Sequence, residues 1–416
     1  MTTERAWLAW LDELTRGLEP YFRPLDELET VHTARILGAF QRVGLGQHHF
    51  APTTGYGYGD PGREALEKAL AELWGAESAL VRQQIVSGTQ AISLSLAALA
   101  RPGEEVLFAG EPYDTLQRAV GLRGPTPGSL AERGVALRVA EWPSAHDNPA
   151  EALIDQVSAR TTLLYLQRSG GYSSRPALTV REIAAVVARN KRLRTPPVVF
   201  VDNCYGEFVE PTEPTMAGAD LMAGSFIKNP GGGLAPCGGY IAGRRDLVER
   251  VASHLYAPGL AGEIGPSLLS PRLFFQGLFC APHLVGQALR GAILCARALA
   301  ELGMATSPAW HEPRTDLIQR IYFGSPEPLL RFCRALQSAS PVDARAVPEP
   351  AILPGYADPI VMAGGTFIQG SSSELTFDAP LRPPYVGYWQ GGLSFAHAKL
   401  ALAKCLAALA ERPPGK

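Results

Sequence analysis

The feature that most constrains the fold is a regular alternation, in the middle of this 416-residue chain, between short apolar runs and longer helical patterns. The helical patterns include Thr89–Leu99, Asp114–Gly121 and Val180–Arg189. Such alternation is typical of an α/β protein in which helices cover both faces of a mainly parallel sheet. We therefore predict strands at the apolar runs, which are Ala79–Val81, Val106–Ala109, Val135–Ala140, Thr162–Leu166, Val198–Asp202, Leu221–Ser225 and Gly238–Ile241.

The two ends of the chain show different patterns. Apolar residues recur at helical spacing in the first 50 residues, and a long helical pattern runs from Leu273 to Leu302. Beyond it we expect helices at Glu327–Ser338 and Ala396–Ala410, with strands near Gly365–Gln369 and Glu374–Phe377. The sequence therefore predicts an N-terminal helical segment (1–50), a large α/β domain (51–270), and a linker helix with a smaller α+β C-terminal domain (271–416).

Composition and charge argue against several classes of protein. The 38 basic and 40 acidic residues give a net charge of −2, and no run of Lys or Arg is present that would bind nucleic acid. The six cysteines are scattered without a Cys-x-x-Cys pair, so we predict neither a metal site nor disulfides. Charged residues interrupt the long apolar stretch, and the start shows no signal-peptide pattern. We expect a cytoplasmic protein without a membrane span.

Two polar residues end apolar strands. Asp202 closes the run that begins at Val198, and Lys228 follows Met222–Ile227 and precedes a glycine loop. A lysine buried in apolar surroundings has a lowered pKa and can form a Schiff base, and a buried carboxylate needs a cationic partner. Pyridoxal 5′-phosphate (PLP) meets both needs through its aldehyde and its protonated pyridine nitrogen. We predict catalytic and cofactor-binding roles for both residues; a surface lysine and a capping aspartate are the alternatives.

A phosphate site is predicted at the start of a helix. Ser87, Gly88 and Thr89 follow a predicted strand, and Ser225 lies just before Lys228. Helix N-terminal N–H groups and neighbouring hydroxyls together bind anions. The same Ser-Gly-Thr sequence is also an ordinary helix cap, but its combination with a cofactor lysine favours the phosphate.

Three tyrosines are candidates for the active site. Tyr113 follows the run Val106–Ala109 and could stack on the PLP ring and relay a proton, or belong to the core. Tyr56 and Tyr58 lie in a glycine-rich loop that could reach an active site, including that of a neighbouring subunit, or form a packed surface loop.

Three arginines are candidates for binding the α-carboxylate of an amino-acid substrate, because a guanidinium holds a carboxylate through two hydrogen bonds. Arg382, in a proline-rich segment, is the first choice. Arg168 and Arg175 flank a loop rich in Ser and Gly after the run Thr162–Leu166 and are its rivals. A surface position is the alternative for each.

These segments resemble the PLP-dependent fold-type I enzymes of cysteine and methionine metabolism. The resemblance is to the branch of the methionine γ-lyase family described as aluminium-resistance or cystathionine β-lyase-like proteins. The strings Phe200–Glu210 and Ile227–Gly233 carry most of it, and it extends over most of the chain after residue 45. It implies the PLP roles proposed above for Lys228, Asp202, Gly88, Thr89, Ser225 and Tyr113.

The resemblance also implies an activity and an assembly. We expect an enzyme that removes the α-proton of a sulfur-containing amino acid and breaks a C–S bond at Cβ or Cγ. We also expect a homodimer or homotetramer in which Tyr56 and Tyr58 reach the partner's phosphate. Related lyases carry a substrate arginine where this chain has Gln390–Ser394, and Arg382 is its substitute. Transamination, aldol cleavage, replacement chemistry and a PLP-binding sensor are the alternatives.

Overall fold

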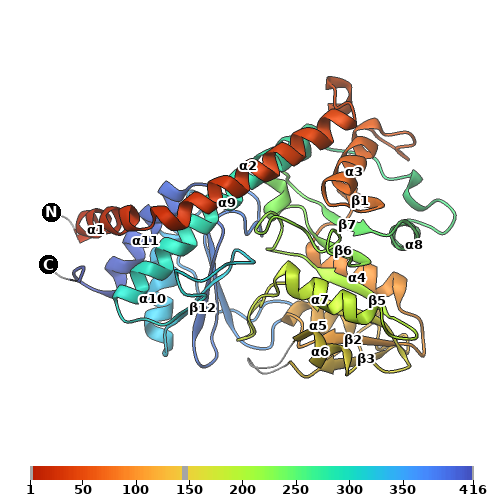
Figure 1. Ribbon diagram of the computed structural model, residues 1–416. Coiled ribbons are helices and arrows are strands. Elements are labelled where there is room, and N and C mark those ends of the chain that lie inside the picture. The colour runs from red at the N-terminus through yellow and green to blue at the C-terminus, as the bar shows by residue number, and fades with distance from the viewer. Residues whose placement is uncertain (1–2, 143–148, 415–416) are drawn as a thin grey trace. The chain divides into compact units, whose positions relative to one another are not determined.

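The computed structural model describes residues 3–142 and 149–414, and the chain forms two compact units (Figure 1). One unit is His32–Phe279, and the other combines Met1–Val31 with Cys280–Lys416. The sequence predicted divisions near residues 50 and 270 instead. Both observed divisions fall inside long helices, α2 (Glu19–Arg42) and α9 (Arg272–Glu301), and an unbroken helical pattern gives no sign of where the packing partner changes.

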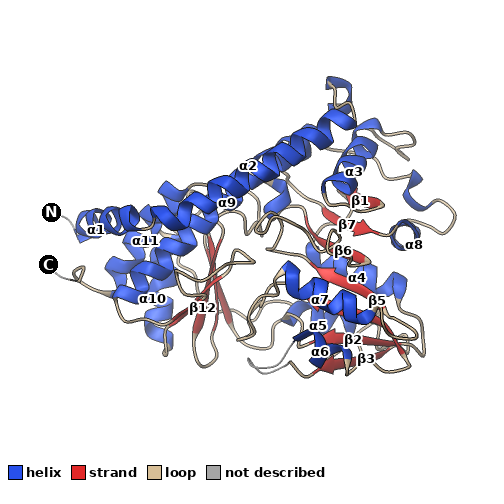
Figure 2. Cartoon of the chain, in the orientation of Figure 1, coloured by secondary structure: helices blue, strands red, loops and turns tan. Residues whose placement is uncertain are grey.

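The unit His32–Phe279 is built on a seven-stranded sheet with the order β1-β7-β6-β5-β4-β2-β3 (Figure 2). All the strands predicted from the apolar runs are present. Strand β7 is antiparallel to both its neighbours, and the other pairings are parallel, so the sheet is mainly parallel as predicted. The bounds are β1 (Ser78–Arg82), β2 (Glu105–Ala109), β3 (Ala136–Ala140), β4 (Thr161–Gln167), β5 (Val198–Asp202), β6 (Leu221–Ser225) and β7 (Gly239–Gly243).

Helices connect these strands, because parallel neighbours need a crossover. Helices α4, α5 and α8 share one apolar cluster with the sheet, to which they contribute Leu96, Leu116 and Val248 respectively. The helices are α3 (Pro61–Leu73), α4 (Gly88–Leu99), α5 (Asp114–Val120), α6 (Pro149–Ile154), α7 (Val180–Asn190) and α8 (Arg245–Leu255), with 3-10 turns η1 (Gln47–Phe50), η2 (Asn229–Gly231) and η3 (Ala261–Glu263).

The register of the sheet gathers polar residues at one edge. Gln167 at the end of β4 pairs with Asp202 at the end of β5, and Asp202 pairs with Ala223 of β6. Because these strands are parallel, their carboxyl ends meet at the same edge of the sheet. This is the edge at which open α/β sheets bind ligands.

The second unit contains a five-stranded antiparallel sheet with the order β10-β11-β12-β9-β8. Trp7, from the N-terminal helix, lies fully buried in the same apolar cluster as Phe332 and Trp389. The first helix therefore belongs to the core of this α+β unit. The elements are α1 (Thr3–Gly17), β8 (Thr306–Ser307), β9 (Gln319–Tyr322), α10 (Pro326–Gln337), β10 (Ile360–Ala363), β11 (Thr376–Pro380), β12 (Val386–Gln390) and α11 (Phe395–Leu409).

The strand predicted near Gly365–Gln369 is wrong. Strand β10 ends before it, at Ala363, and the next residue, Gly364, has a φ of +107°, which suits glycine and does not continue a strand. The N–H groups of Phe367 and Ile368 donate to the carboxylate of Glu374 at 2.8 and 2.9 Å. A side chain therefore takes the hydrogen bonds that a neighbouring strand would otherwise accept.

Helix α9 is long and apolar enough to cross a bilayer by length and composition, and it is the one such helix among the described residues. In the structure, 67% of its most apolar window is buried inside the protein. A core helix of a globular protein shows the same pattern, and packing therefore accounts for its apolar length.

Candidate active site

Lys228 lies just beyond the end of β6, where the 3-10 turn η2 begins. Its Nζ atom sits over the ring of Tyr205, 3.7 Å from the ring centroid. The next residue, Asn229, is buried and donates from Nδ2 to the backbone oxygen of Glu207 at 2.9 Å. The glycine loop after Lys228 packs closely as well, because a Cβ at Gly231 would come within 2.0 Å of the Phe226 carbonyl oxygen. The backbone that follows Lys228 is therefore held in a tight turn.

Asp202 ends β5 and is almost completely buried. Its Oδ2 accepts a hydrogen bond from the Tyr165 hydroxyl at 2.9 Å, and its Oδ1 accepts one from the backbone N–H of Cys204 at 3.0 Å. Burial raises the pKa of the Asp202 carboxyl group, while the positive charge of Lys228 and these two donors favour the carboxylate. The carboxylate is thus held in one orientation and faces a cation.

The electrostatics of Lys228 correct one expectation. The apolar sequence around it predicted a lowered pKa. Burial does lower the pKa of this amine, but the neighbouring Cys204, Tyr205 and Asp202 outweigh burial and raise it above its ordinary value. Burial also raises the pKa of the Cys204 thiol well above its usual range, so the thiol is neutral near pH 7 and Asp202 supplies the negative charge. The charges of Lys228 and Asp202 therefore stabilise each other across the site.

The predicted phosphate residues come together at the start of α4. The Ser87 hydroxyl accepts the N–H of Gln90, which leaves the N–H groups of Gly88 and Thr89 at the open end of the helix. A Cβ at Gly88 would approach Cys204 Sγ to 3.1 Å and Ser225 Cβ to 3.2 Å, so only glycine lets the helix start lie this close to β6. Helix N–H groups, two hydroxyls and a nearby ammonium fit a phosphate dianion.

Tyr113 joins the same group of residues. Its hydroxyl donates to Thr89 Oγ1 at 3.0 Å, and its backbone N–H donates to Gln167 Oε1 at 2.9 Å. Burial, followed by the charges of Asp202 and Cys204, raises the pKa of the Tyr113 phenol well above 10. The phenol is therefore protonated at neutral pH and can act as a proton donor.

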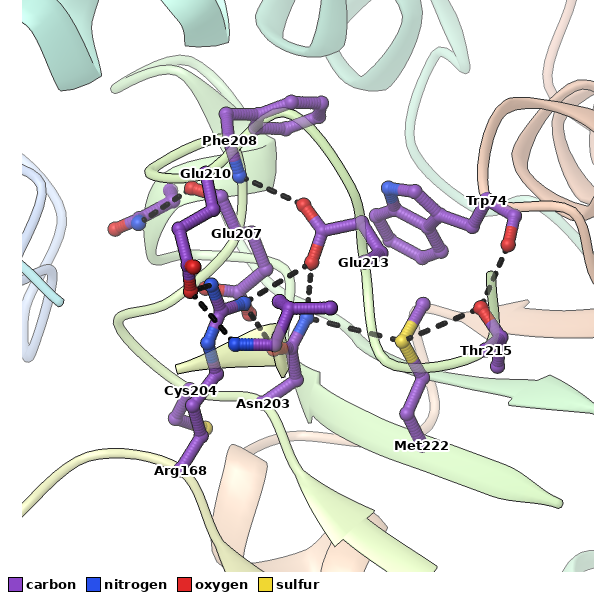
Figure 3. Close-up of polar contacts among 12 residues, drawn as sticks. Trp74, Arg168, Asn203, Cys204, Glu207, Phe208, Glu210, Glu213, Thr215 and Met222 are labelled. Atoms are coloured by element: carbon purple, nitrogen blue, oxygen red, sulfur yellow. Dashed lines mark hydrogen bonds and ion pairs between the residues drawn. The ribbon is translucent and has the colours of Figure 1, made fainter. Parts of the chain in front are cut away.

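Arg168 lies in a buried polar network (Figure 3). Its side chain is fully buried. Nη1 donates to Asn203 Oδ1 at 2.7 Å and to Glu213 Oε2 at 3.2 Å, and Nη2 donates to Glu210 Oε2 at 2.7 Å. Two carboxylates already neutralise this guanidinium, which argues against a role in binding a substrate carboxylate. Arg168 is a structural residue of the fold.

Arg175 and Arg382 have different surroundings. Arg175 is buried, stacks on Trp142 with Cζ 4.6 Å from the ring centroid, and donates from Nη2 to the backbone oxygens of Gln167 and Ser169 at 2.7 and 2.6 Å. Arg382 belongs to the other unit and pairs with Asp358 at 3.0 Å, with both side chains partly exposed. Arg175 braces its own loop, whereas the exposed pair of Arg382 can open at small energetic cost.

Tyr56 and Tyr58 lie on the surface, with 69% and 62% of their area exposed. Their rings face each other at 5.7 Å between centroids. The loop is anchored to a second loop at residues 265–266. The Gly265 N–H donates to the backbone oxygen of Tyr56 at 2.9 Å, and a Cβ at Gly57 would clash with Pro266. The predicted contact with a partner's phosphate therefore stays a prediction.

Two residues of the site were not predicted from the sequence. Tyr205 supplies the ring beneath Lys228, and Glu207 is a fully buried carboxyl group whose Oε1 accepts from the Tyr240 hydroxyl at 2.6 Å. Burial raises the pKa of Glu207 to about 8. Both lie in the string Phe200–Glu210 that carried the resemblance. Their polar side chains, so close after Asp202, are the signal that could have identified them.

A model of the methionine gamma-lyase family matches residues 9–410. The chain belongs to this family. The uncharacterized protein YnbB of Bacillus subtilis (strain 168) is 44% identical to it over 402 residues, which cover 96% of each chain. The family that the strings Phe200–Glu210 and Ile227–Gly233 indicated is therefore confirmed.

Solved structures agree with this membership. A protein from Listeria innocua described as a candidate cystathionine beta-lyase involved in aluminum resistance superposes with a TM-score of 0.92 at 45% identity, covering 98% of this chain and 99% of that one. A carbon-sulfur lyase involved in aluminum resistance from Clostridium novyi NT gives 0.90 at 40% identity, covering 97% and 96%. A pyridoxal-5′-phosphate dependent protein from Escherichia coli, at 17% identity and a TM-score of 0.61, shares the fold. The predicted fold class, fold type I, is confirmed.

The structural role of Arg168 leads to a stability prediction. We expect Arg168→Met to lower the free energy of unfolding by about 3–5 kcal/mol, because it leaves Glu210 and Glu213 without their buried cation. Urea unfolding of the purified protein measures this. Arg189→Met, which removes a surface pair with Glu151, is the control and should change stability by at most about 1 kcal/mol. A stable Arg168→Met protein with weakened substrate binding would return Arg168 to the substrate site.

Proposed function

We propose that this chain is a PLP-dependent carbon–sulfur lyase that acts on a sulfur-containing amino acid. The observation that carries the proposal is the meeting of Lys228, Asp202, Tyr113 and the start of α4 in one group at the carboxyl edge of the sheet. Membership of the methionine gamma-lyase family and the likeness to a carbon-sulfur lyase support the reaction class.

The residues present fit PLP. Lys228 would hold its aldehyde carbon, Asp202 would keep its pyridine nitrogen protonated, and Ser87, Gly88, Thr89 and Ser225 would surround its phosphate. When bound, PLP supplies an electron sink that stabilises a carbanion at Cα of an amino acid. The remaining chemistry falls to side chains of this chain.

Lys228 is the base of the proposed reaction. Its Nζ, in the neutral amine form, would remove the proton from Cα of the substrate and become an ammonium group. Asp202 keeps its charge through the hydrogen bonds from Tyr165 and the Cys204 N–H. Tyr113, whose phenol stays protonated, can give its proton to the departing sulfur.

The cofactor assignment is tested by the visible absorbance spectrum before and after borohydride reduction. We expect a yellow protein that bleaches on reduction and carries a pyridoxyl group on the peptide that contains Lys228. We expect Lys228→Ala to lose that group and to slow keto-acid release from the active sulfur amino acid by about 10²- to 10⁴-fold, because the base is gone. Mass mapping and a screen of sulfur amino acids measure both.

Lys191→Ala is the matched control, because Lys191 is exposed on the surface of the same unit. It should keep both the spectrum and the activity. A colourless wild-type protein that cannot be reconstituted with PLP would contradict the proposal. If the protein is yellow but forms the products of transamination or of replacement, the cofactor assignment stands and the lyase reaction is contradicted.

We further propose that Arg382 binds the α-carboxylate of the substrate. The Arg382 side chain is partly exposed in its pair with Asp358, whereas Arg168 and Arg175 are bound to buried partners. We expect Arg382→Ala to raise KM by about 10- to 100-fold, which is the loss of a charged hydrogen-bonded pair, and to leave the cofactor spectrum intact. Steady-state kinetics measure the change, with Arg345→Ala, an exposed arginine of the same unit, as the control. An unchanged KM would move the role to Arg175.

We propose that the enzyme is a homo-oligomer with active sites shared between subunits, in the cytoplasm. Four large apolar side chains are more than 60% exposed on segments that the structure ties together: Tyr56, Tyr58, Val86 and Leu268. Gln83 and Leu269 exchange two hydrogen bonds of 2.9 Å between these segments. Exposed apolar side chains gathered on joined segments, next to the phosphate residue Ser87, support a subunit contact there. The six free cysteines suit a reducing compartment.

Shared sites are tested by mixing two inactive variants. We expect Lys228→Ala and the double variant Tyr56→Ala, Tyr58→Ala to be inactive alone. After dissociation and reassociation together, about a quarter of the wild-type activity should return, because half of the dimers are hybrids with one intact site of two. Activity assays of the mixture measure the recovery. A mixture that stays inactive, although its subunits exchange, would show that the two tyrosines act in their own chain.

A further inference from the structure

The backbone after Asp202 contains an outlier. Residues 203–206 form a tight turn that is closed by a hydrogen bond of 3.0 Å from the Gly206 N–H to the Asn203 oxygen. Tyr205, inside this turn, has a φ of +72°, in the left-handed region that favours glycine and is rare for bulky side chains. A residue persists in such a conformation only where its surroundings hold it there, and such residues gather at functional sites.

Buried contacts hold the turn from both sides. The Cys204 N–H is bound by Asp202 Oδ1, and the Asn203 side chain accepts from Arg168 and donates to Glu213 Oε2 at 2.9 Å. A Cβ at residue 206 would come within 2.5 Å of Arg168 Cδ, so the guanidinium stem packs directly against the turn. The network of Figure 3 therefore fixes the strained turn.

The turn directs the Tyr205 ring toward the reactive lysine. With Nζ 3.7 Å from the ring centroid, Lys228 lies within the distance at which a cation is attracted to the face of an aromatic ring. The attraction grows when water is excluded, and both Lys228 and Tyr205 are partly buried. The strained backbone thus has a specific result, which is an aromatic face presented to an ammonium group.

We propose that Tyr205 is a positioning residue whose ring face binds the Lys228 ammonium and stabilises the protonated form of this base, with the Arg168 network holding the ring in place. This role rests on the proposed function of Lys228. When the lysine removes the α-proton, the Cα–H bond breaks, an N–H bond forms on Nζ, and the electron pair stays on the substrate. The ring favours the ammonium that this step produces.

Four groups act electrostatically on Lys228, which are Asp202, Cys204, Tyr205 and Glu207. A test must therefore change the ring alone. Replacing Tyr205 by Phe removes the hydroxyl and keeps the ring face. Placing trifluorinated phenylalanine at the same position keeps the shape and withdraws charge from the face. This series separates the ring from the hydroxyl and from the other three groups.

The readout is the rate at which acetic anhydride labels Lys228 in the full-length protein after any bound cofactor has been removed with hydroxylamine, measured by mass spectrometry at pH 8. The exposed Lys68 in the same sample is the internal reference. The amine reacts only when deprotonated, so the ratio of the two rates reports the protonation of Lys228. We expect Tyr205→Phe to stay near wild type and the trifluorinated ring to raise the ratio by about tenfold, equivalent to roughly one pKa unit.

Equal ratios for Phe and trifluorinated phenylalanine would overturn the proposal. A rise that appears in full at Tyr205→Phe would also overturn it, because the hydroxyl and not the ring face would then act on the amine. If a substitution prevents folding, the ¹³C chemical shift of labelled Lys228 Cε in the wild-type protein still reports ring contact: an upfield ring-current shift is expected, and an ordinary value contradicts the stacked geometry. Neither measurement needs PLP, so their failure is distinct from failure of the proposed function.

Discussion

Burying charged groups at the carboxyl edge of the parallel sheet is the constraint on which this site depends. Asp202 is almost completely buried, and an unpaired charge in that position would cost several kcal/mol. The carboxylate is further held by Tyr165 and the Cys204 N–H. The positive charge of Lys228 and these two donors keep the carboxylate ionised at the place where the proposed PLP chemistry needs it.

A second buried charge network lies behind the first. Arg168 joins Asn203, Glu210 and Glu213, and through Asn203 it is connected to the turn that follows Asp202. The arginine that first resembled a substrate ligand is therefore part of the support. The contacts of Arg168 hold the turn, and with it the left-handed backbone conformation of Tyr205, which a bulky residue rarely adopts.

Local patterns in the sequence were enough for the parts of the site that depend on strand ends and helix starts. Asp202 and Lys228 each follow an apolar run, and Ser87-Gly88-Thr89 begins a helix, so their positions follow from the order of elements. The strand predicted near Gly365 does not form. The carboxylate of Glu374 accepts hydrogen bonds from two backbone N–H groups there, and no local sequence pattern reveals this contact. The boundaries between the two units differ from those predicted near residues 50 and 270, because α2 and α9 continue unbroken across the observed boundaries.

The sequence by itself determined the mainly parallel α/β core, because apolar strands alternating with helices have few other ways to bury their surfaces. It also determined which residue types end those strands. Only the tertiary structure decided the electrostatics, since the raised pKa of Lys228 comes from groups on a different strand and turn. Only the tertiary structure assigned Arg168 to buried carboxylates and Tyr205 to the lysine, because charge pairing and ring contacts depend on distances in space that sequence spacing does not fix.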